Sequence, residues 1–214
     1  HNISLSKIKV VKNGVNLELF QPQEKDKELL KSLELENKTV IGYIGTHGMA
    51  HGLDFVLQCA NEVTNPNVHF LFVGSGAKKD ELLALKESLK LKNVSMVGMV
   101  SKKEVKKYIS ITDISLVNLR KSDTFKSVIP SKIFECVGMS KPILLGVEGE
   151  SKKIVESYGV GEPFEPENKE QFLQKVNEMC LHPKDYSSGF SKMRNDFDRK
   201  KLAKQMIKFI RMPL

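Results

Sequence analysis

The sequence predicts an α/β fold, namely a Rossmann-like doubly wound parallel sheet. Short apolar runs alternate with segments whose apolar residues recur at helical spacing. The runs are continuously apolar, which is typical of parallel strands buried on both faces. Glycine-rich turns follow three of these runs, at 45–48, at 74–76 and at 98. In sheets of this type, ligands bind beyond the carboxyl ends of the strands, where these turns would lie.

The expected strands lie at residues 8–11, 39–44, 68–73, 94–97, 113–119 and 143–145. The first run ends at Asn13-Gly14, a pair that is typical of turns. The second, Thr-Val-Ile-Gly-Tyr-Ile, has the composition of a buried strand. Right-handed crossovers between successive strands would place helices on both faces of one sheet.

The expected helices carry apolar residues at spacings of three and four. They lie at residues 53–63, 80–91, 101–109, 151–157, 171–180 and 200–210, the last within a terminal helical segment 198–214. Ser101 and Glu104 match a capping box at the start of a lysine-rich helix. With no internal repeat and no convincing second domain, residues 1–214 are expected to form one domain.

Composition and charge narrow the class of protein. The 214 residues are 40% hydrophobic and 28% charged, as is ordinary for a globular domain, and no apolar run approaches a membrane span or a signal peptide. Because the chain starts at His1, we interpret it as part of a longer protein. The net charge of +8 suits nucleic acid, an anionic membrane or a polyphosphate ligand. Trp is absent and aromatic residues do not alternate with basic ones, which disfavours nucleic acid.

The cysteines indicate a reducing compartment. Cys59, Cys136 and Cys180 are odd in number and far apart, and two of them fall in apolar helical patterns. Free buried thiols in the cytosol are therefore expected rather than a disulfide or a zinc site.

Residues 129–146 form the most informative segment, and we interpret them as a loop, a short helix and an apolar strand. The helix opens at Pro130-Ser131, and a helix N-terminus offers free amides to a phosphate. Glu135 follows Ser131 by about one turn, where a carboxylate could accept sugar hydroxyls. Two other interpretations remain open: Glu135 could cap the helix or pair with Lys132, and Lys132 could be solvated.

The segment Gly45-Thr46-His47-Gly48-Met49-Ala50-His51-Gly52 comes after an expected strand and before an expected helix. Glycines there would let amides approach a diphosphate, although the spacing matches neither a dinucleotide nor a nucleoside triphosphate motif. His47 and His51 are four residues apart, as in some metal sites, but no carboxylate accompanies them. A histidine that reaches a phosphate is the favoured interpretation.

Two lysine-rich helices admit two interpretations. One carries Lys102, Lys103, Lys106 and Lys107, and the other includes Arg199, Lys200, Lys201, Lys204, Lys208 and Arg211. Each could be a solvated face or could contact an anionic membrane that carries the acceptor.

These motifs together resemble the C-terminal domain of GT-B glycosyltransferases, in the retaining "group 1" branch. The resemblance covers nearly the whole chain and is closest to bacterial surface-polysaccharide enzymes that attach N-acetylated deoxy-sugars such as N-acetyl-fucosamine. The matching segments occur in the family's order, at 10–16 with Phe20, 45–52, 74–76, 93–94, 98–100 and 130–135.

The resemblance implies a role for each donor-binding residue. Glu135 would hold the ribose hydroxyls, as the second glutamate of the family's E-x7-E motif. The amides of Ser131 and Lys132 would face the diphosphate, Met99 and Val100 would lie beside the base, and Gly45 and Gly48 would line the cleft.

The chain also departs from the family pattern. The first glutamate of E-x7-E is replaced by Ser127, and the usual Arg and Lys of the glycine loop by Thr46 and His51. As a hypothesis, His47, His51, Lys132 or Lys126 compensates for the missing charges.

The resemblance implies a donor-binding domain that uses a nucleotide diphosphate-sugar, with UDP as the expected nucleotide, to extend a glycan or lipid-linked acceptor. It implies no metal or cofactor, a cytoplasmic location at the inner face of the membrane, and an N-terminal acceptor domain outside this chain. The catalytic residues stay unassigned, and the fragment alone is expected to be inactive. The alternatives are a nucleotide-sugar 2-epimerase of the same architecture and a non-catalytic binding module.

Overall fold

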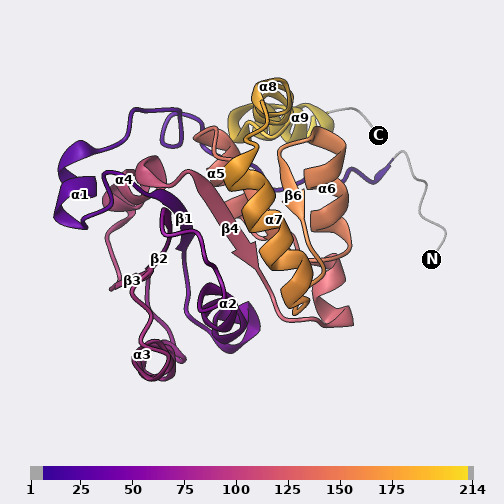
Figure 1. Ribbon diagram of the computed structural model, residues 1–214. Helices are drawn as coiled ribbons and strands as arrows, with labels where there is room; N and C mark the ends of the chain where they lie inside the picture. The colour runs from indigo at the N-terminus through magenta and orange to yellow at the C-terminus, as the bar shows by residue number, and fades with distance from the viewer. Residues whose placement is uncertain (1–6, 212–214) are drawn as a thin grey trace.

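The computed structural model describes residues 7–211, and within them one parallel sheet of six strands has the order β3-β2-β1-β4-β5-β6 (Figure 1). The strands are β1 (Thr39–Ile44), β2 (Val68–Val73), β3 (Val94–Val97), β4 (Ile114–Asn118), β5 (Ile143–Gly146) and β6 (Gly161–Pro163). This arrangement confirms the predicted doubly wound, Rossmann-like fold.

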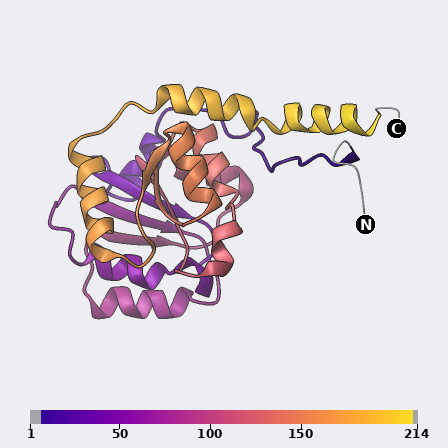
Figure 2. The same ribbon diagram turned by 90° about the vertical axis from the view of Figure 1, so that its right-hand side faces the viewer.

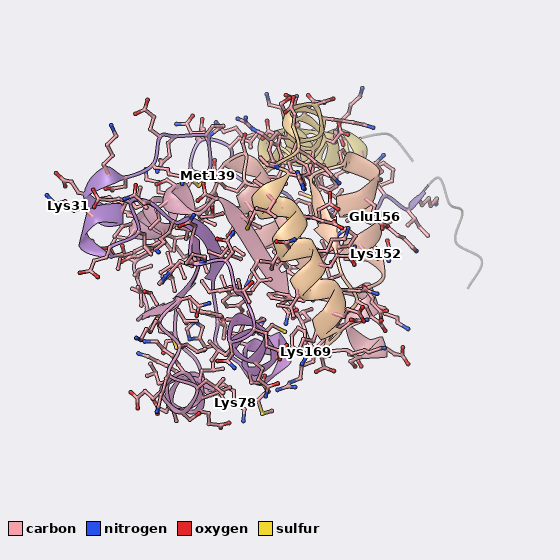
Figure 3. The ribbon with its side chains drawn as sticks, viewed as in Figure 1. Lys31, Lys78, Met139, Lys152, Glu156 and Lys169 are labelled. Atoms are coloured by element: carbon pink, nitrogen blue, oxygen red, sulfur yellow. The ribbon has the colours of Figure 1, made fainter. Side chains whose placement is uncertain are left out.

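Helices connect the strands and cover both faces of the sheet. They are α1 (Lys27–Ser32), α2 (Leu53–Ala60), α3 (Lys79–Ser88), α4 (Lys102–Ile111), α5 (Lys132–Gly138), α6 (Glu150–Tyr158), α7 (Lys169–Leu181), α8 (Ser187–Asp196) and α9 (Arg199–Ile210), with 3-10 turns η2 (Met49–His51) and η3 (Asp123–Ser127). Charged side chains such as Lys31, Lys152 and Glu156 point outward (Figure 3).

Alternating strand residues build separate cores on the two faces. Tyr43 and Phe72 pack in one cluster with residues of α2, α3 and α7. Val40 packs with α1 and α4, and Val117 packs with α5, α6 and α8. The apolar runs are therefore buried on both sides, which is the physical reason that they show no polar alternation.

The strand order reverses between β1 and β4, and this junction is short. The two strands are in register over two residue pairs, Ile41 with Ile114 and Gly42 with Ser115. By contrast, β1 pairs with β2 from Thr39–Val68 to Ile44–Val73. Ligands bind at the carboxyl ends of strands beside such a reversal, so this geometry places the site.

The structure corrects one strand and adds three elements. Residues 8–11 are not a strand: within the described residues they form no sheet pairing, and Ile8 and Val10 are exposed. An apolar run becomes a strand only when another strand accepts its hydrogen bonds. The helices α1 and α8 and the short strand β6 were not predicted.

The two ends of the described chain leave the globular body on the same side (Figure 2). Val15 bridges Asp198, which caps α9, and α9 itself buries no residue completely. The predicted terminal segment 198–214 is thus helical from Arg199 to Ile210. Residues 212–214, like residues 1–6, lie outside the described residues.

Candidate functional site

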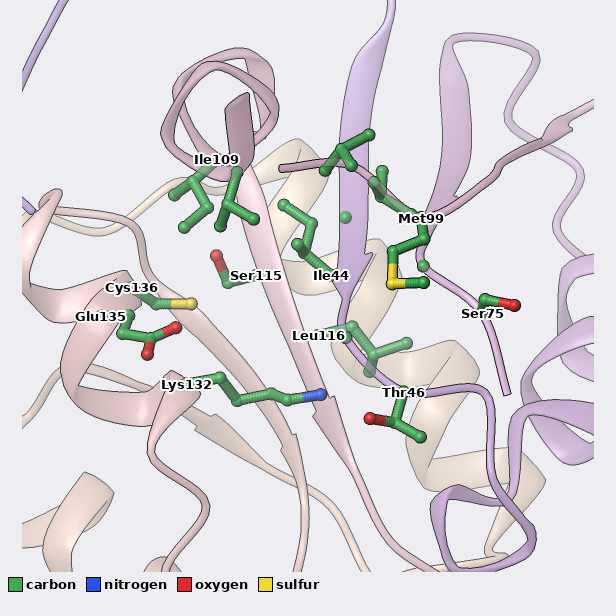
Figure 4. Close-up of a pocket in the computed structure, with 16 residues that line it drawn as sticks. Ile44, Thr46, Ser75, Met99, Ile109, Ser115, Leu116, Lys132, Glu135 and Cys136 are labelled. Carbon is green, nitrogen blue, oxygen red and sulfur yellow. The ribbon is translucent and has the colours of Figure 1, made fainter. Parts of the chain in front are cut away.

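A pocket of about 270 Å³ opens at the carboxyl ends of β1 and β2, beside Ser115 and Leu116 of β4, at the reversal of strand order (Figure 4). Its walls come from β1, β4, α4, α5 and the turns after β2 and β3. They include the predicted site residues Gly45, Met99, Val100, Lys132 and Glu135, together with Ile44, Thr46, Ser75, Ile109, Ser115, Leu116 and Cys136.

Lys132 places an unpaired cation inside this pocket. Its side chain reaches from α5 toward Thr46 (Figure 4), and its Nζ lies 3.8 Å from the centroid of the buried Tyr43 ring. The Nζ is inaccessible to solvent and has no hydrogen-bond partner among the described residues. Burial lowers the pKa of Lys132 from 10.5 to about 8, against the opposing effects of Cys136 and Glu135.

Glu135 is half-buried beside Lys132, but the two side chains form no ion pair in the described part of the chain. Burial raises the pKa of Glu135, and the nearby positive charges of Lys132 and Arg199 oppose this shift. Glu135 also lines a second pocket of about 340 Å³, together with Ser131 and Arg199. Glu135 thus borders both pockets.

Two glycines allow the backbone around the pocket to approach closely. Gly45 has a φ of +152°, and a Cβ there would lie 2.8 Å from the Lys132 Nζ. Gly74 has a φ of +144°, and a Cβ there would lie 2.0 Å from the Gly45 carbonyl oxygen. A side chain at Gly45 would therefore displace the end of Lys132, and one at Gly74 would collide with the backbone of Gly45.

The two predicted histidines lie behind the pocket wall. His47 is fully buried near Tyr43 and Phe72, and neither of its ring nitrogens has a partner among residues 7–211. Burial and the charges of Lys132 and Lys79 lower its pKa. Burial, followed by the charge of Lys132, lowers the pKa of His51 to about 4. These shifts favour the neutral form of both rings, and a histidine that compensates for the missing cation stays a hypothesis.

The other predicted residues lie around the pocket rather than in it. Gly48 lines a smaller pocket of about 130 Å³ with Asp54 and Arg120. Ser131 lines the neighbouring pocket that it shares with Glu135. Ser127 is exposed on η3, and Lys126 is exposed and pairs with Asp123 at 2.6 Å. Lys132 thus contributes the cation of the main pocket.

Two residues that the sequence did not point to hold the glycine loop. Asn118 is the last residue of β4, and its Nδ2 donates to the His51 carbonyl oxygen at 2.8 Å. Two residues later, the Nε of Arg120 donates to the Met49 carbonyl oxygen at 2.9 Å. A polar residue at the end of the apolar run Ile-Ser-Leu-Val-Asn was the available signal.

Metal binding has no support in the geometry of the histidines. Among residues 7–211, three or more His, Cys, Asp or Glu side chains nowhere gather as a metal site would require. The expectation that the site uses no metal stays a prediction.

A pocket at the switch point of a doubly wound sheet lies where α/β domains of this type bind their ligands. The family of this domain follows from its sequence. Residues 24–204 match the model of the glycosyl transferases group 1 family, and the chain belongs to that family. Membership favours sugar transfer over the 2-epimerase alternative.

Two curated relatives come from bacterial polysaccharide synthesis. TuaH of Bacillus subtilis (strain 168), whose name proposes a teichuronic acid biosynthesis glycosyltransferase, is 33% identical over 140 residues, covering 64% of this chain and 34% of its own. WcaI of Escherichia coli (strain K12), similarly named for colanic acid biosynthesis, is 24% identical over 179 residues. The match covers 82% of this chain and 44% of WcaI. The matched segments therefore cover less than half of the length of either relative.

Solved structures share the fold. Anabaena Alr3699/HepE, in complex with UDP and glucose, superposes with a TM-score of 0.81 at 18% identity, over 94% of this chain and 56% of that one. The C-terminal domain of the group 1 glycosyl transferase LpcC from Francisella tularensis has a TM-score of 0.65 at 17% identity. The superposition covers 91% of this chain and 98% of the LpcC domain. The described chain thus has the fold of one domain of a GT-B glycosyltransferase.

The helices of the described chain are short or carry many charged residues. None of those in residues 7–211 combines the length and the apolar content that a bilayer span requires.

Proposed function

We propose that this chain is the donor-binding domain of a retaining glycosyltransferase that uses a nucleoside diphosphate sugar. The observation that carries the proposal is the Nζ of Lys132, a buried cation without a counter-ion in the pocket at the carboxyl ends of β1 and β2. A buried charge of this kind is costly unless a ligand of opposite charge compensates it. A diphosphate supplies that charge and fits beside the glycines.

The chemistry proposed for the site is stabilisation of the leaving group. When the bond from the sugar to the diphosphate breaks, negative charge develops on the diphosphate oxygens, and Lys132 and the loop amides would hold it. Glu135 would accept hydrogen bonds from the ribose hydroxyls. Met99 is 80% exposed at the rim of the pocket, where it and Val100 could cover the base.

The proposed nucleotide and acceptor are supported by the similar proteins. UDP is supported by the complex of HepE with UDP and glucose, and a polysaccharide or lipid-linked acceptor by the names of TuaH and WcaI. An N-acetylated hexose donor, metal-free transfer and a place on the cytoplasmic face of the membrane belong to the same proposal. The lysines of α4 would favour an anionic membrane surface.

The test is nucleotide binding by the chain itself. Titration with UDP, GDP and dTDP by calorimetry is expected to give binding to one of them, which identifies the base. Lys132→Met keeps the length of the side chain but removes its charge, and we expect an affinity loss of about tenfold or more. Lys31→Met, an exposed lysine on α1, is the control and should bind as the parent chain does.

Thermal unfolding controls for folding. Lys132→Met should unfold at no lower a temperature than the parent, because it removes a buried charge that lacks a partner. Failure of the parent chain to bind any of the three nucleotides would contradict the proposal and favour a binding module of another kind. If the full-length protein converts UDP-sugar alone to an epimer, the transferase assignment is wrong.

A further inference from the structure

We propose that Asn118 and Arg120, at the exit of β4, are positioning residues that hold the glycine loop in its diphosphate-binding shape. This inference rests on the proposed function. Arg120 lines the small pocket on the far side of the loop, together with Gly48 and Asp54, and does not line the pocket that contains Lys132. It would therefore act through the loop rather than on the donor.

Asn118 and Arg120 donate hydrogen bonds to four consecutive backbone carbonyl groups, those of residues 49–52. Arg120 donates from its Nε to Met49 at 2.9 Å and from its backbone N to Ala50 at 2.9 Å. The Nδ2 of Asn118 donates to His51 at 2.8 Å and to Gly52 at 3.4 Å. All four carbonyl oxygens of residues 49–52 thus face the exit of β4.

This orientation fixes the amides as well. In a trans peptide, the C=O and N–H groups point in opposite directions, and the described residues contain no cis peptide. The N–H groups of residues 50–53 therefore face away from β4. If these peptide groups lost their donors, they could rotate, and the loop would spend part of its time in shapes that do not fit a diphosphate.

Arg120 is itself held in place by a fork of two hydrogen bonds. One of its terminal nitrogens, Nη2, lies 2.8 Å from each oxygen of Asp54, in the first turn of α2. The other terminal nitrogen, Nη1, lies 3.3 Å from Glu167. Geometry with both carboxylate oxygens engaged makes this ion pair more rigid than an ordinary surface pair.

The space around Asn118 also leaves its amide little freedom. A Cβ at Gly146, its neighbour in β5, would lie 2.1 Å from the Asn118 Oδ1. A Cβ at Gly52, which has a left-handed φ of +56°, would lie 3.2 Å from its Nδ2. Glycine at both positions leaves room for the amide to lie between β5 and the loop.

The first half of the loop is held separately, by the exit of β2. The N–H of Gly45 donates to Val73 and the N–H of His47 donates to Ser75, each at 2.9 Å. The loop is thus fixed at one end by β2 and at the other by β4. Loss of the Arg120 side chain removes the bond to Met49 and the ion pair with Asp54, so it loosens the second half at Met49 and leaves the first half in place.

The experiment compares a nucleoside with its diphosphate in Arg120→Ala. NMR titration of the chain with UDP and with uridine, and with GDP or dTDP if one of these binds the parent, separates the diphosphate contribution from that of the base. We expect an affinity loss of about tenfold for UDP and no change for uridine. Arg120→Lys cannot serve Met49 and both oxygens of Asp54 at once, so it should resemble Arg120→Ala.

The matched control is Lys169→Ala. This change removes an exposed ion pair of Lys169 with Glu62 at 2.8 Å, just beyond the other end of α2, and should leave both affinities unchanged. Asp54→Asn is the second variant, since it keeps the Arg120 bond to Met49 and should give a smaller loss for UDP alone.

Three results overturn the inference: UDP affinity of Arg120→Ala within twofold of the parent, equal losses for UDP and uridine in either variant, or a UDP loss in Lys169→Ala as large as that in Arg120→Ala. A parent chain that binds no nucleoside diphosphate refutes the proposed function instead, so the two failures are distinguishable.

Discussion

Lys132 has an environment that an isolated lysine would avoid. It lies in the first turn of α5, where the helix dipole disfavours a cation, and its Nζ is buried over the ring of Tyr43. The ring face offers some electrostatic compensation but no hydrogen bond. Its burial without a counter-ion therefore lowers the stability of the domain, and on the proposed function a bound diphosphate would offset this cost.

The pKa of Lys132 leads to a testable pH dependence. In the folded chain the pKa of Lys132 is about 8, below the ordinary lysine value of 10.5. As the pH rises through 8, Lys132 therefore loses the proton, and with it the positive charge that would bind the diphosphate. We expect nucleotide affinity to fall between about pH 7.5 and 9.5, where the phosphate charge is already constant. Calorimetry should show proton uptake on binding in this range, and Lys132→Met should show a flat pH dependence.

The same shift affects stability with a definite sign. Between pH 8 and 10.5 the unfolded chain holds a proton on Lys132 that the folded chain has lost. The contribution of this residue to the free energy of unfolding therefore rises with pH across that window.

The predicted pH dependence of binding can fail. A nucleotide affinity that stays constant to pH 9.5 would show that Lys132 does not carry the charge that binds the ligand.

Signals that are local in sequence led to two residues that line the main pocket, whereas their roles in binding stay predictions. The helix start at Pro130-Ser131 and the one-turn spacing to Glu135 were sufficient to place Lys132 and Glu135 near a pocket. The roles of Asn118 and Arg120 were not predictable in this way. Their partners lie 67 and 71 residues away in the chain, so only the folded sheet brings them together.

At the level of elements, the strand exits control how closely the loops approach each other. The turns after β1 and β2 are in contact at Gly45 and Gly74, while the turn after β3 is open around Gly98. The three glycines look equivalent in the sequence but differ in the space that surrounds them.

We expect Gly74→Ala and Gly98→Ala to behave differently. At Gly74 the φ of +144° and the 2.0 Å approach to the Gly45 carbonyl oxygen would force the backbone to move, at a cost of about 2 kcal/mol or more in the free energy of unfolding. At Gly98 the nearest atom is the flexible Lys79 Nζ at 3.8 Å, so a change below about 1 kcal/mol is expected. Urea unfolding measures both, and equal effects would contradict the close contact.

Two of the three missed elements, α1 and β6, share a physical cause. The helix α1 spans six residues and β6 three, too few for a periodic pattern to emerge from the surrounding loops. Gly and Pro within β6 also weaken any strand signal. The false strand at 8–11 shows the opposite case, because a suitable local composition found no pairing partner among the described residues.

At the scale of the whole molecule, the terminal helix contributes little to the core. Residues 203–210 of α9 are exposed or half-buried, whereas α8 buries Phe190 and Met193. The domain should therefore tolerate loss of one helix but not of both.

Truncation tests this difference. Removal of residues 203–214 should shift the melting temperature by no more than about 4 °C, because few apolar contacts are lost. Removal of residues 187–214 should prevent cooperative unfolding, because Met193 and Phe197 leave the core that they form with α5. A large loss from the shorter truncation would mean that α9 stabilises the fold through contacts that burial does not reveal.

The short junction between β1 and β4 has a mechanical consequence for the domain. Two register pairs join the strands of the half that contains β3, β2 and β1 to those of the half that contains β4, β5 and β6, and one apolar core packs Ile41 against Ile114 across the same junction. The pocket takes residues from both halves, Gly45 on one side and Lys132 on the other. A bound molecule would therefore act as a crosslink, and part of its binding free energy would appear as resistance of this junction to local opening. Release of the molecule and separation of the two halves would then be coupled events.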